Sequence, residues 1–222
     1  MTIEDRDLRQ RDIVPPQRLA QHHPTVIGVG AIGRQVALQL ASIGVKTLRL
    51  YDPDTVEPVN LAPQGYHEAD LGRLKVQATA EQCQEINPHL EVHEVPYRFR
   101  RRDEVGDVVF VCVDSIATRQ LIWESAGPHA DFYCDGRMSA EVVRVLTVAS
   151  GFGRSHYPTT LFQAAEAYTG SCTSKSTIFT ANIAAGLMLE QFAKWLRRMP
   201  VDADLTLNLL AGELTVAAPV AT

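Results

Sequence analysis

The sequence predicts an α/β fold of the Rossmann type, with three layers and a parallel sheet that antiparallel strands extend in the C-terminal half. Three observations predict it. A short β-branched strand leads into a Gly-x-Gly-x-x-Gly loop over residues 25–33, strands alternate with helices as far as residue 134, and two short strands flank Ala211-Gly212 near the C-terminus. A length of 222 residues, 45% hydrophobic and 21% charged, suits a single domain over 1–222.

The individual elements follow from hydrophobic periodicity and turn residues. We expect helices over residues 31–42, 72–86, 117–126 and 176–196, and strands over 25–29, 47–51, 90–95, 107–113, 132–134, 141–149, 205–209 and 213–216. A charged helical arm, residues 1–24, precedes them. An irregular crossover-type loop, residues 150–175, interrupts the second half, and loops of that length tend to be functional or mobile. The last two strands are expected to form a hairpin.

The glycine loop predicts a nucleotide site. Its glycines let the backbone turn tightly and leave room for a phosphate at the N-terminus of the next helix: Gly28, Gly30 and Gly33. Asp52 lies nineteen residues after Gly33, at the end of the next strand, and can reach a ribose hydroxyl. By itself the motif is most typical of a nicotinamide or flavin cofactor, so it predicts a nucleotide and leaves the chemistry open.

Composition and charge exclude several classes of protein. The net charge of −5 and the lack of a long Lys/Arg run argue against nucleic-acid binding. A short arginine cluster is expected to be a solvated loop: Arg98, Arg100, Arg101 and Arg102. No apolar run approaches the roughly 20 residues of a membrane helix, so we expect a cytoplasmic protein with no membrane partner. Because Cys83, Cys112, Cys134 and Cys172 form no Cys-x-x-Cys pair, no structural zinc is expected, and the first three should pack in the core.

Motifs beyond the glycine loop carry a family resemblance. In chain order they are Arg6-Asp7-Leu8-Arg9-Gln10, the run Asp52-Pro53-Asp54-Thr55-Val56 continuing to Asn60-Leu61, then Gly72-Arg73-Leu74-Lys75, Asn87-Pro88, and Asp114 with Arg119 five residues later. This order, from residue 6 to about residue 190, resembles the ubiquitin-activating superfamily, the ThiF, MoeB and HesA group of adenylating enzymes. The resemblance implies an ATP-dependent adenylyltransferase that activates the C-terminal carboxylate of a small β-grasp ubiquitin-like or sulfur-carrier protein.

That chemistry suits the residue types present. A carboxylate is already deprotonated at neutral pH, so attack on the α-phosphate of ATP needs cations and fixed donors around the polyphosphate and no general base. By resemblance, Asp52 holds the ribose, Asp54 lies beside the nucleotide, and Asn60 and Lys75 contact the phosphates. Asp114 binds Mg²⁺.

Two further residues are implied by the resemblance. Arg9 would face the phosphates from the neighbouring subunit of a homodimer. Cys172 falls close to a crossover-loop cysteine that in some members forms a thioester or acyl-disulfide, and a nearby helix N-terminus and Lys175 would favour its thiolate. The alternative for Cys172 is a buried cysteine that packs as a small hydrophobe.

Other residues also have plain structural alternatives. Lys75 could be a solvated helix lysine, Asp54 a turn residue, and Asp114 the cap of the helix near Ala117. Arg119 is expected to form an ion pair with Asp114 or Asp135.

Position 63 departs from the family pattern. Asn-Leu is followed in the family by x-Arg-Gln, whose arginine contacts phosphate, whereas this chain reads Asn60-Leu61-Ala62-Pro63-Gln64. Either Arg73 or Arg137 replaces the missing cation, or the adenylation chemistry is weakened or altered. Two other functions therefore stay open: an NAD-binding oxidoreductase, and a catalytically silent nucleotide-binding scaffold.

Overall fold

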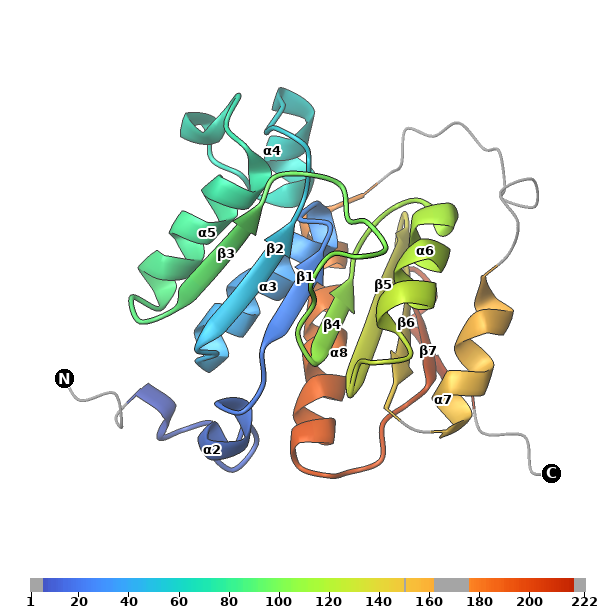
Figure 1. Cartoon of the computed structure of the whole chain (residues 1–222). Coiled ribbons are helices and arrows are strands. Elements are labelled where there is room, and N and C mark those ends of the chain that lie inside the picture. The colour runs from blue at the N-terminus through green and yellow to red at the C-terminus, as the bar shows by residue number, and fades with distance from the viewer. Residues whose placement is uncertain (1–5, 150, 162–175, 218–222) are drawn as a thin grey trace.

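A single eight-stranded sheet forms the centre of the computed structural model, which describes residues 6–149, 151–161 and 176–217 (Figure 1). The strand order is β3-β2-β1-β4-β5-β6-β7-β8, parallel from β3 to β5 and antiparallel from β5 to β8. The strands are β1 Pro24–Ile27, β2 Thr47–Tyr51, β3 Glu91–Val95, β4 Val108–Val111, β5 Phe132–Ser139, β6 Val142–Val148, β7 Asp204–Asn208 and β8 Glu213–Val216. The predicted mixed sheet and the terminal hairpin are confirmed.

Helices cover both faces of the sheet and complete the three layers. The first face carries α3 Ala31–Ile43, α5 Lys75–Ile86 and α8 Ile178–Leu196, and the second carries α6 Ile116–Ala126, α7 Gly151–His156 and the 3₁₀ turn η2 Tyr157–Thr160. Successive side chains of a strand point to opposite faces of the sheet, as its pleated geometry requires. Val26 packs in the core under α3 and α8, and Ile27 packs with Ile122 of α6.

The strand order reverses at β1, which pairs with β2 on one side and β4 on the other. Ligands of open α/β sheets bind outside the carboxyl ends of the strands at such a switch point. The fold therefore places the glycine loop after β1, and the segment containing Asp114 after β4, at one edge of the sheet (Figure 1).

Three segments differ from the sequence prediction. The arm over 1–24 is mostly turns in its described part, with the short helix α2 Pro16–Leu19. Residues 151–160, predicted to be irregular, form α7 and η2, and the rest of that loop lies outside the described residues except Leu161. Helix α4 Pro58–Gln64 and the 3₁₀ turn η1 Glu68–Asp70 were not predicted. Helix α4 forms because Pro58 starts it, a capping box at Glu57 closes its N-terminus and Gly65 ends it in the left-handed conformation.

The cysteines outside residues 162–175 behave as packing residues. Cys83 and Cys134 are fully buried, and burial raises the pKa of each thiol to about 12. Cys112 is half-buried against the same core. The prediction that these three cysteines pack in the core is confirmed for the two that are fully buried.

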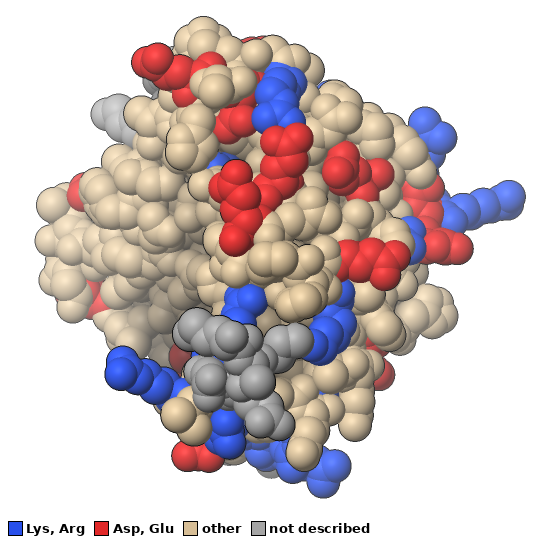
Figure 2. Space-filling model, turned by 90° about the vertical axis from the view of Figure 1, so that its left-hand side faces the viewer, with Lys and Arg blue, Asp and Glu red and all other residues tan. Residues whose placement is uncertain are grey.

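Charge on the molecular surface is mixed, as Figure 2 shows for the side formed by β3 and α5. Acidic side chains gather on this side (Figure 2). Helix α5 and strand β3 carry four exposed glutamates, Glu81, Glu85, Glu91 and Glu94. Because β3 is an edge strand, its charged side chains discourage pairing with another sheet. No helix in the described part of the chain is both long and apolar enough to cross a bilayer.

The antiparallel half is tied together by Asp204 on β7. Its carboxylate accepts two hydrogen bonds from Arg144 on β6, at 2.9 and 2.6 Å, and lies 2.8 Å from His156 Nε2 on α7. Burial raises the pKa of Asp204, but the bonds with Arg144 and His156 outweigh burial and hold the pKa below its ordinary value. Its ionised form therefore stabilises the folded state above the unfolded pKa, and this contribution disappears as pH falls through the folded pKa.

We expect Asp204→Asn to lower the free energy of unfolding at pH 7 by about 1 kcal/mol, because a part-exposed charged pair is lost. The difference from wild type should shrink as the pH is lowered through the folded pKa of Asp204. Urea unfolding at several pH values measures both effects. Asp131→Asn, at an exposed carboxylate, is the control and should change little. A difference that does not depend on pH would contradict the electrostatic explanation.

Candidate functional site

The glycine loop between β1 and α3 forms the floor of the candidate site. Gly28 has a φ of +88°, and a Cβ there would lie 2.8 Å from the carbonyl oxygen of Cys112. A Cβ on Gly33 would overlap the carbonyl of Gly28, so these two glycines are required by the packing of the chain itself. A Cβ on Gly30 would meet nothing within 4 Å. Of the three glycines predicted to leave room for a nucleotide, Gly30 is the one that faces open space.

Helix α3 begins at this loop without a side-chain cap. Gly30 is its N-cap residue and contributes no side-chain hydrogen bond, so first-turn N–H groups have no cap acceptor. Such a helix N-terminus favours an anion through its N–H groups and its dipole.

Asp52 fixes the loop to the end of β2. Asp52 is 6% exposed, and its carboxylate accepts hydrogen bonds from Val29 N at 2.6 Å and from Asp54 N at 2.9 Å. Burial raises the pKa of Asp52, and the N–H groups of Asp54 and Val29 oppose that effect. A carboxylate has about four acceptor positions, so these two bonds leave acceptor capacity for a further donor.

Lys75 starts α5 and lies beside Asp54. The Lys75 side chain is 8% exposed, its Nζ is 3.3 Å from Oδ2 of Asp54, and its backbone N–H bonds the Asp54 carbonyl at 2.9 Å. The alternative of a solvated helix lysine is therefore wrong. The Asp54 side chain is 60% exposed, so the pair lies at the border between protein and solvent.

The Asn60 side chain caps the N-terminus of α4. Its Oδ1 accepts a hydrogen bond from Glu57 N at 2.9 Å, which closes the capping box. The bond uses the carbonyl end of the side chain and leaves the amide N–H₂ group as a donor for a ligand.

Asp114 is exposed and follows β4 across the switch point from the glycine loop. The cap of α6 is the next residue, Ser115, whose hydroxyl accepts from Thr118 N at 3.4 Å. The capping alternative for Asp114 is therefore wrong. Within the residues that the structure describes, no group of three or more His, Cys, Asp or Glu side chains could hold a metal ion by itself.

A buried charged cluster is centred on Asp135 of β5, near the same edge of the sheet. Asp135 is fully buried and forms an ion pair with Arg119, which confirms the predicted pairing, and a second one with Arg137 at 2.9 Å. Tyr157, which the sequence analysis did not single out, donates its hydroxyl to the same carboxylate at 2.9 Å. Arg119 also donates to the carbonyls of Val113 and Gly136. The cluster ties α6 and η2 to the ends of β4 and β5.

The two cations suggested as substitutes for an arginine at position 63 are both engaged. Arg73 bridges Asp70, at 3.2 Å, and Glu81. Arg137 bonds Asp135 and the carbonyl of Thr160, the latter at 2.9 Å. Neither guanidinium is free to take a new anion without giving up a protein contact.

Arg9 lies at the opposite edge of the sheet from the glycine loop. Its segment is anchored to the C-terminal end of α3, where Arg6 donates to the Ala41 carbonyl at 2.7 Å and Gln10 to the Ile43 carbonyl at 3.2 Å (Figure 1). Helix α3 has 13 residues and is therefore about 20 Å long. Arg9 does not approach the glycine loop of its own chain. Cys172 lies outside the described residues.

Sequence reasoning missed two residues beside the loop, Arg34 and Tyr66. Arg34 on α3 is 2% exposed, and Tyr66 donates its hydroxyl to the Val29 carbonyl at 2.8 Å. Neither belongs to a motif. The available signal in the sequence was that Arg34 is the one charged residue in the predicted helix.

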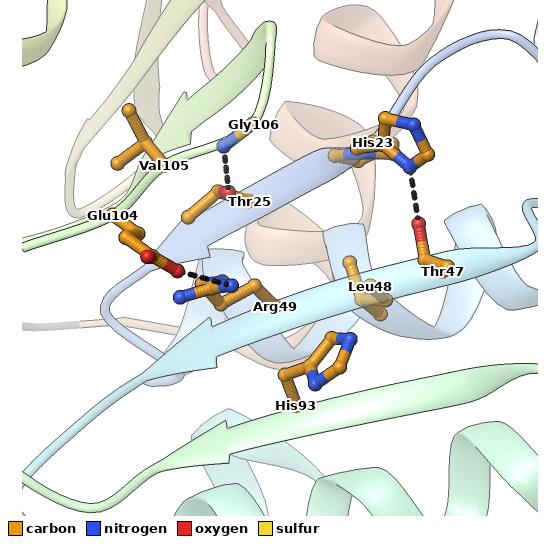
Figure 3. Close-up of a pocket in the computed structure, with 10 residues that line it drawn as sticks. His23, Thr25, Thr47, Leu48, Arg49, His93, Glu104, Val105 and Gly106 are labelled. Atoms are coloured by element: carbon orange, nitrogen blue, oxygen red, sulfur yellow. Dashed lines mark hydrogen bonds and ion pairs between the residues drawn. The ribbon is translucent and has the colours of Figure 1, made fainter.

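A hollow of about 490 Å³ lies elsewhere, on the second face at the amino ends of β1 and β2 (Figure 3). Arg49 pairs there with Glu104 at 3.1 Å, and His23 Nδ1 lies 2.9 Å from the Thr47 hydroxyl. No predicted site residue in the described part of the chain lines it. The hollow is separate from the candidate site.

Comparison with known sequences gives a consistent result. Residues 6–212 match the ThiF family. The chain is 36% identical over 131 residues to the adenylyltransferase and sulfurtransferase uba4 of Aspergillus clavatus, covering 52% of this chain and 26% of that protein. It is 37% identical over 112 residues to the adenylyltransferase and sulfurtransferase MOCS3-1 of Zea mays, covering 48% and 24%. The chain thus spans about a quarter of the length of these relatives.

Solved structures share the fold. E. coli MccB with MccA-N7isoASN superposes with a TM-score of 0.78 at 15% identity, over 98% of this chain and 72% of that one. PaaA superposes with a TM-score of 0.76 at 20% identity, over 96% and 72%. At these identities the likeness establishes the fold alone.

The two kinds of glycine in the loop should respond differently to a methyl group. Gly33→Ala forces a Cβ into the Gly28 carbonyl and should lower the free energy of unfolding by about 3 kcal/mol. Gly30→Ala, where a Cβ meets open space, should change it by less than about 1 kcal/mol. Chemical denaturation of both variants measures the difference. Equal losses would show that the loop is not packed as described.

Proposed function

The chain belongs to the ThiF family, and from this premise we propose that it is an ATP-dependent adenylyltransferase acting on the C-terminal carboxylate of a small carrier protein. One observation carries the proposal. The buried Lys75 lies with Asp54 at the edge where the glycine loop, held by Asp52, presents an uncapped helix N-terminus. The names of the Aspergillus and maize relatives support it.

The residues present fit ATP and magnesium. Gly30 leaves open space in front of the first turn of α3, where a phosphate would meet N–H groups and the positive end of the dipole. Mg²⁺ is usually held by one or two carboxylates together with substrate phosphates, and Asp114 supplies such a carboxylate. When bound, the ion neutralises charge on the polyphosphate.

Each side chain then has a role in the proposed reaction. Asp52 accepts a hydrogen bond from the ribose, while the Asn60 amide and the Lys75 ammonium hold the phosphates. The carrier's carboxylate oxygen forms a bond to the α-phosphorus. The bond between that phosphorus and the α–β bridging oxygen breaks, and its electron pair leaves with pyrophosphate. The chain needs no base in this step, because the nucleophile is already an anion.

The partner and the assembly are part of the proposal. The carrier is a β-grasp protein of the ubiquitin-like or sulfur-carrier class, and the enzyme is a homodimer. Arg9 reaches the phosphates of the neighbouring subunit, which agrees with its place at the far edge of its own sheet. The role proposed for Cys172 is a later covalent step with the activated carrier.

Exchange of label between pyrophosphate and ATP, in the presence of a β-grasp carrier ending in Gly-Gly, tests the reaction. We expect Lys75→Met and Asp114→Ala to lower exchange by about 100-fold, because each removes charge stabilisation from the polyphosphate. The matched controls are Lys46→Met and Asp131→Ala, at exposed positions outside the site. Tighter binding of NADH than of ATP with Mg²⁺, or exchange that survives both site variants, would overturn the proposal.

Mixing variants tests the role of Arg9 across a dimer. Arg9→Ala and Lys75→Met homodimers should each be inactive, but a mixed dimer would pair the intact Arg9 of one subunit with the intact Lys75 of the other. An equimolar, fully exchanged mixture should therefore recover about a quarter of wild-type exchange. Absence of recovery after verified subunit exchange would argue against a contribution in trans.

A further inference from the structure

Proline at position 63 removes a cation from the place where the family carries a phosphate-contacting arginine. Pro63 lies in α4, two residues before Gly65. The structure shows which positive charge lies near that helix end. It belongs to Arg34, on the first turns of α3, whose backbone N–H bonds the Gly30 carbonyl at 3.0 Å.

The Arg34 guanidinium lies between α3 and the end of α4. A Cβ built on Gly65 would be 3.6 Å from Nη1 of Arg34, so the guanidinium lies within contact distance of the end of α4. The guanidinium lies over the ring of Tyr66, 4.5 Å from its centroid. Tyr66 in turn bonds the Val29 carbonyl in the glycine loop. Arg34 is thereby linked to the loop that faces the proposed phosphates.

This guanidinium lacks an anionic partner among the residues that the structure describes. Within the described part of the chain, the Arg34 guanidinium makes one hydrogen bond, from Nη2 to the neutral side chain of Gln82, and its buried Nε has no acceptor there. The charge of Asp70 raises the pKa of Arg34. The Asp70 carboxylate itself accepts hydrogen bonds from Arg73 and from the backbone N–H of His67. Burial lowers the pKa of Arg34, which shows that desolvation outweighs the nearby charges.

A buried cation without a counter-ion is costly, and an anion that completes its hydrogen bonds recovers that cost. Building on the proposed function, we infer that Arg34 replaces the family arginine at position 63 and binds the polyphosphate of ATP. The positive charge thus comes from α3 in this chain, whereas the family pattern places it at position 63, in α4. The ring of Tyr66 positions the Arg34 guanidinium by a cation–π contact.

Nucleotide binding by Arg34→Met tests the inference, with the free protein, Mg²⁺ and no carrier. The variant keeps the apolar stem and removes the charge. Isothermal titration should show ATP bound about tenfold more weakly, because a charge-assisted hydrogen bond is lost. Adenosine, which has no phosphate, should bind as it does to wild type. Arg73→Met removes a guanidinium already paired with Asp70 and Glu81, and is the control that should bind ATP normally.

A second variant separates a charge effect from a structural one. Adding Pro63→Arg to Arg34→Met should restore most of the ATP affinity, because it returns a guanidinium to the family position. If circular dichroism shows that Arg34→Met does not fold, Arg34→Gln takes its place in both comparisons.

Three results would count against the inference. A folded Arg34 variant that binds ATP like wild type would overturn it, as would equal losses for ATP and adenosine or failure of Pro63→Arg to restore ATP affinity. Wild type that binds no ATP would overturn the proposed function, and the inference with it.

Discussion

The hydrogen bond from Val29 N to the buried carboxylate of Asp52 is the contact on which the candidate site depends. It joins the loop after β1 to the end of β2. The same carboxylate accepts Asp54 N, and Asp54 in turn contacts Lys75 through both its backbone and its side chain. One buried acid thus sets the relative positions of the glycine loop, the turn after β2 and the first residue of α5. Burying an unpaired carboxylate costs free energy. The folded state therefore favours keeping the hydrogen bonds between Asp52 and its partners.

Charge is distributed unevenly around this contact. Asp135 on β5 pairs with Arg119 and Arg137, and Arg73 pairs with Asp70 and Glu81 near the surface. Within residues 6–149, 151–161 and 176–217, the guanidinium of buried Arg34 has no carboxylate partner and contacts a neutral amide and an aromatic ring. Fully engaged arginines stabilise the fold, whereas an arginine that lacks a counter-ion is suited to binding one.

Much of the fold could be predicted from the sequence. Strand β2 was predicted with its observed bounds, and the start of α3 at Ala31 follows from the glycine loop. Helix α4 was missed because its sequence contains two prolines and follows a turn signal. A helix of seven residues tolerates Pro63, since Val59, whose carbonyl loses a partner, lies on the exposed surface.

The site was predictable only where it follows motifs. Glycine spacing and the position of Asp52 predict where a nucleotide would lie, and the burial of Lys75 is consistent with the proposed place of this lysine in that site. Arg34 could not be found in this way, because its importance depends on which residues α4 and α5 bring around it. The same applies to Tyr157, whose contact with Asp135 joins segments 22 residues apart in sequence.

The overlap that a methyl group on Gly33 would create with the Gly28 carbonyl also bears on the thermodynamics of recognition. A loop packed this closely has its backbone shape fixed before any ligand arrives. Ordering a flexible residue costs about 1–2 kcal/mol of conformational entropy. An anion that docks at α3 meets donors already aligned, so little of its binding energy is spent on ordering the loop.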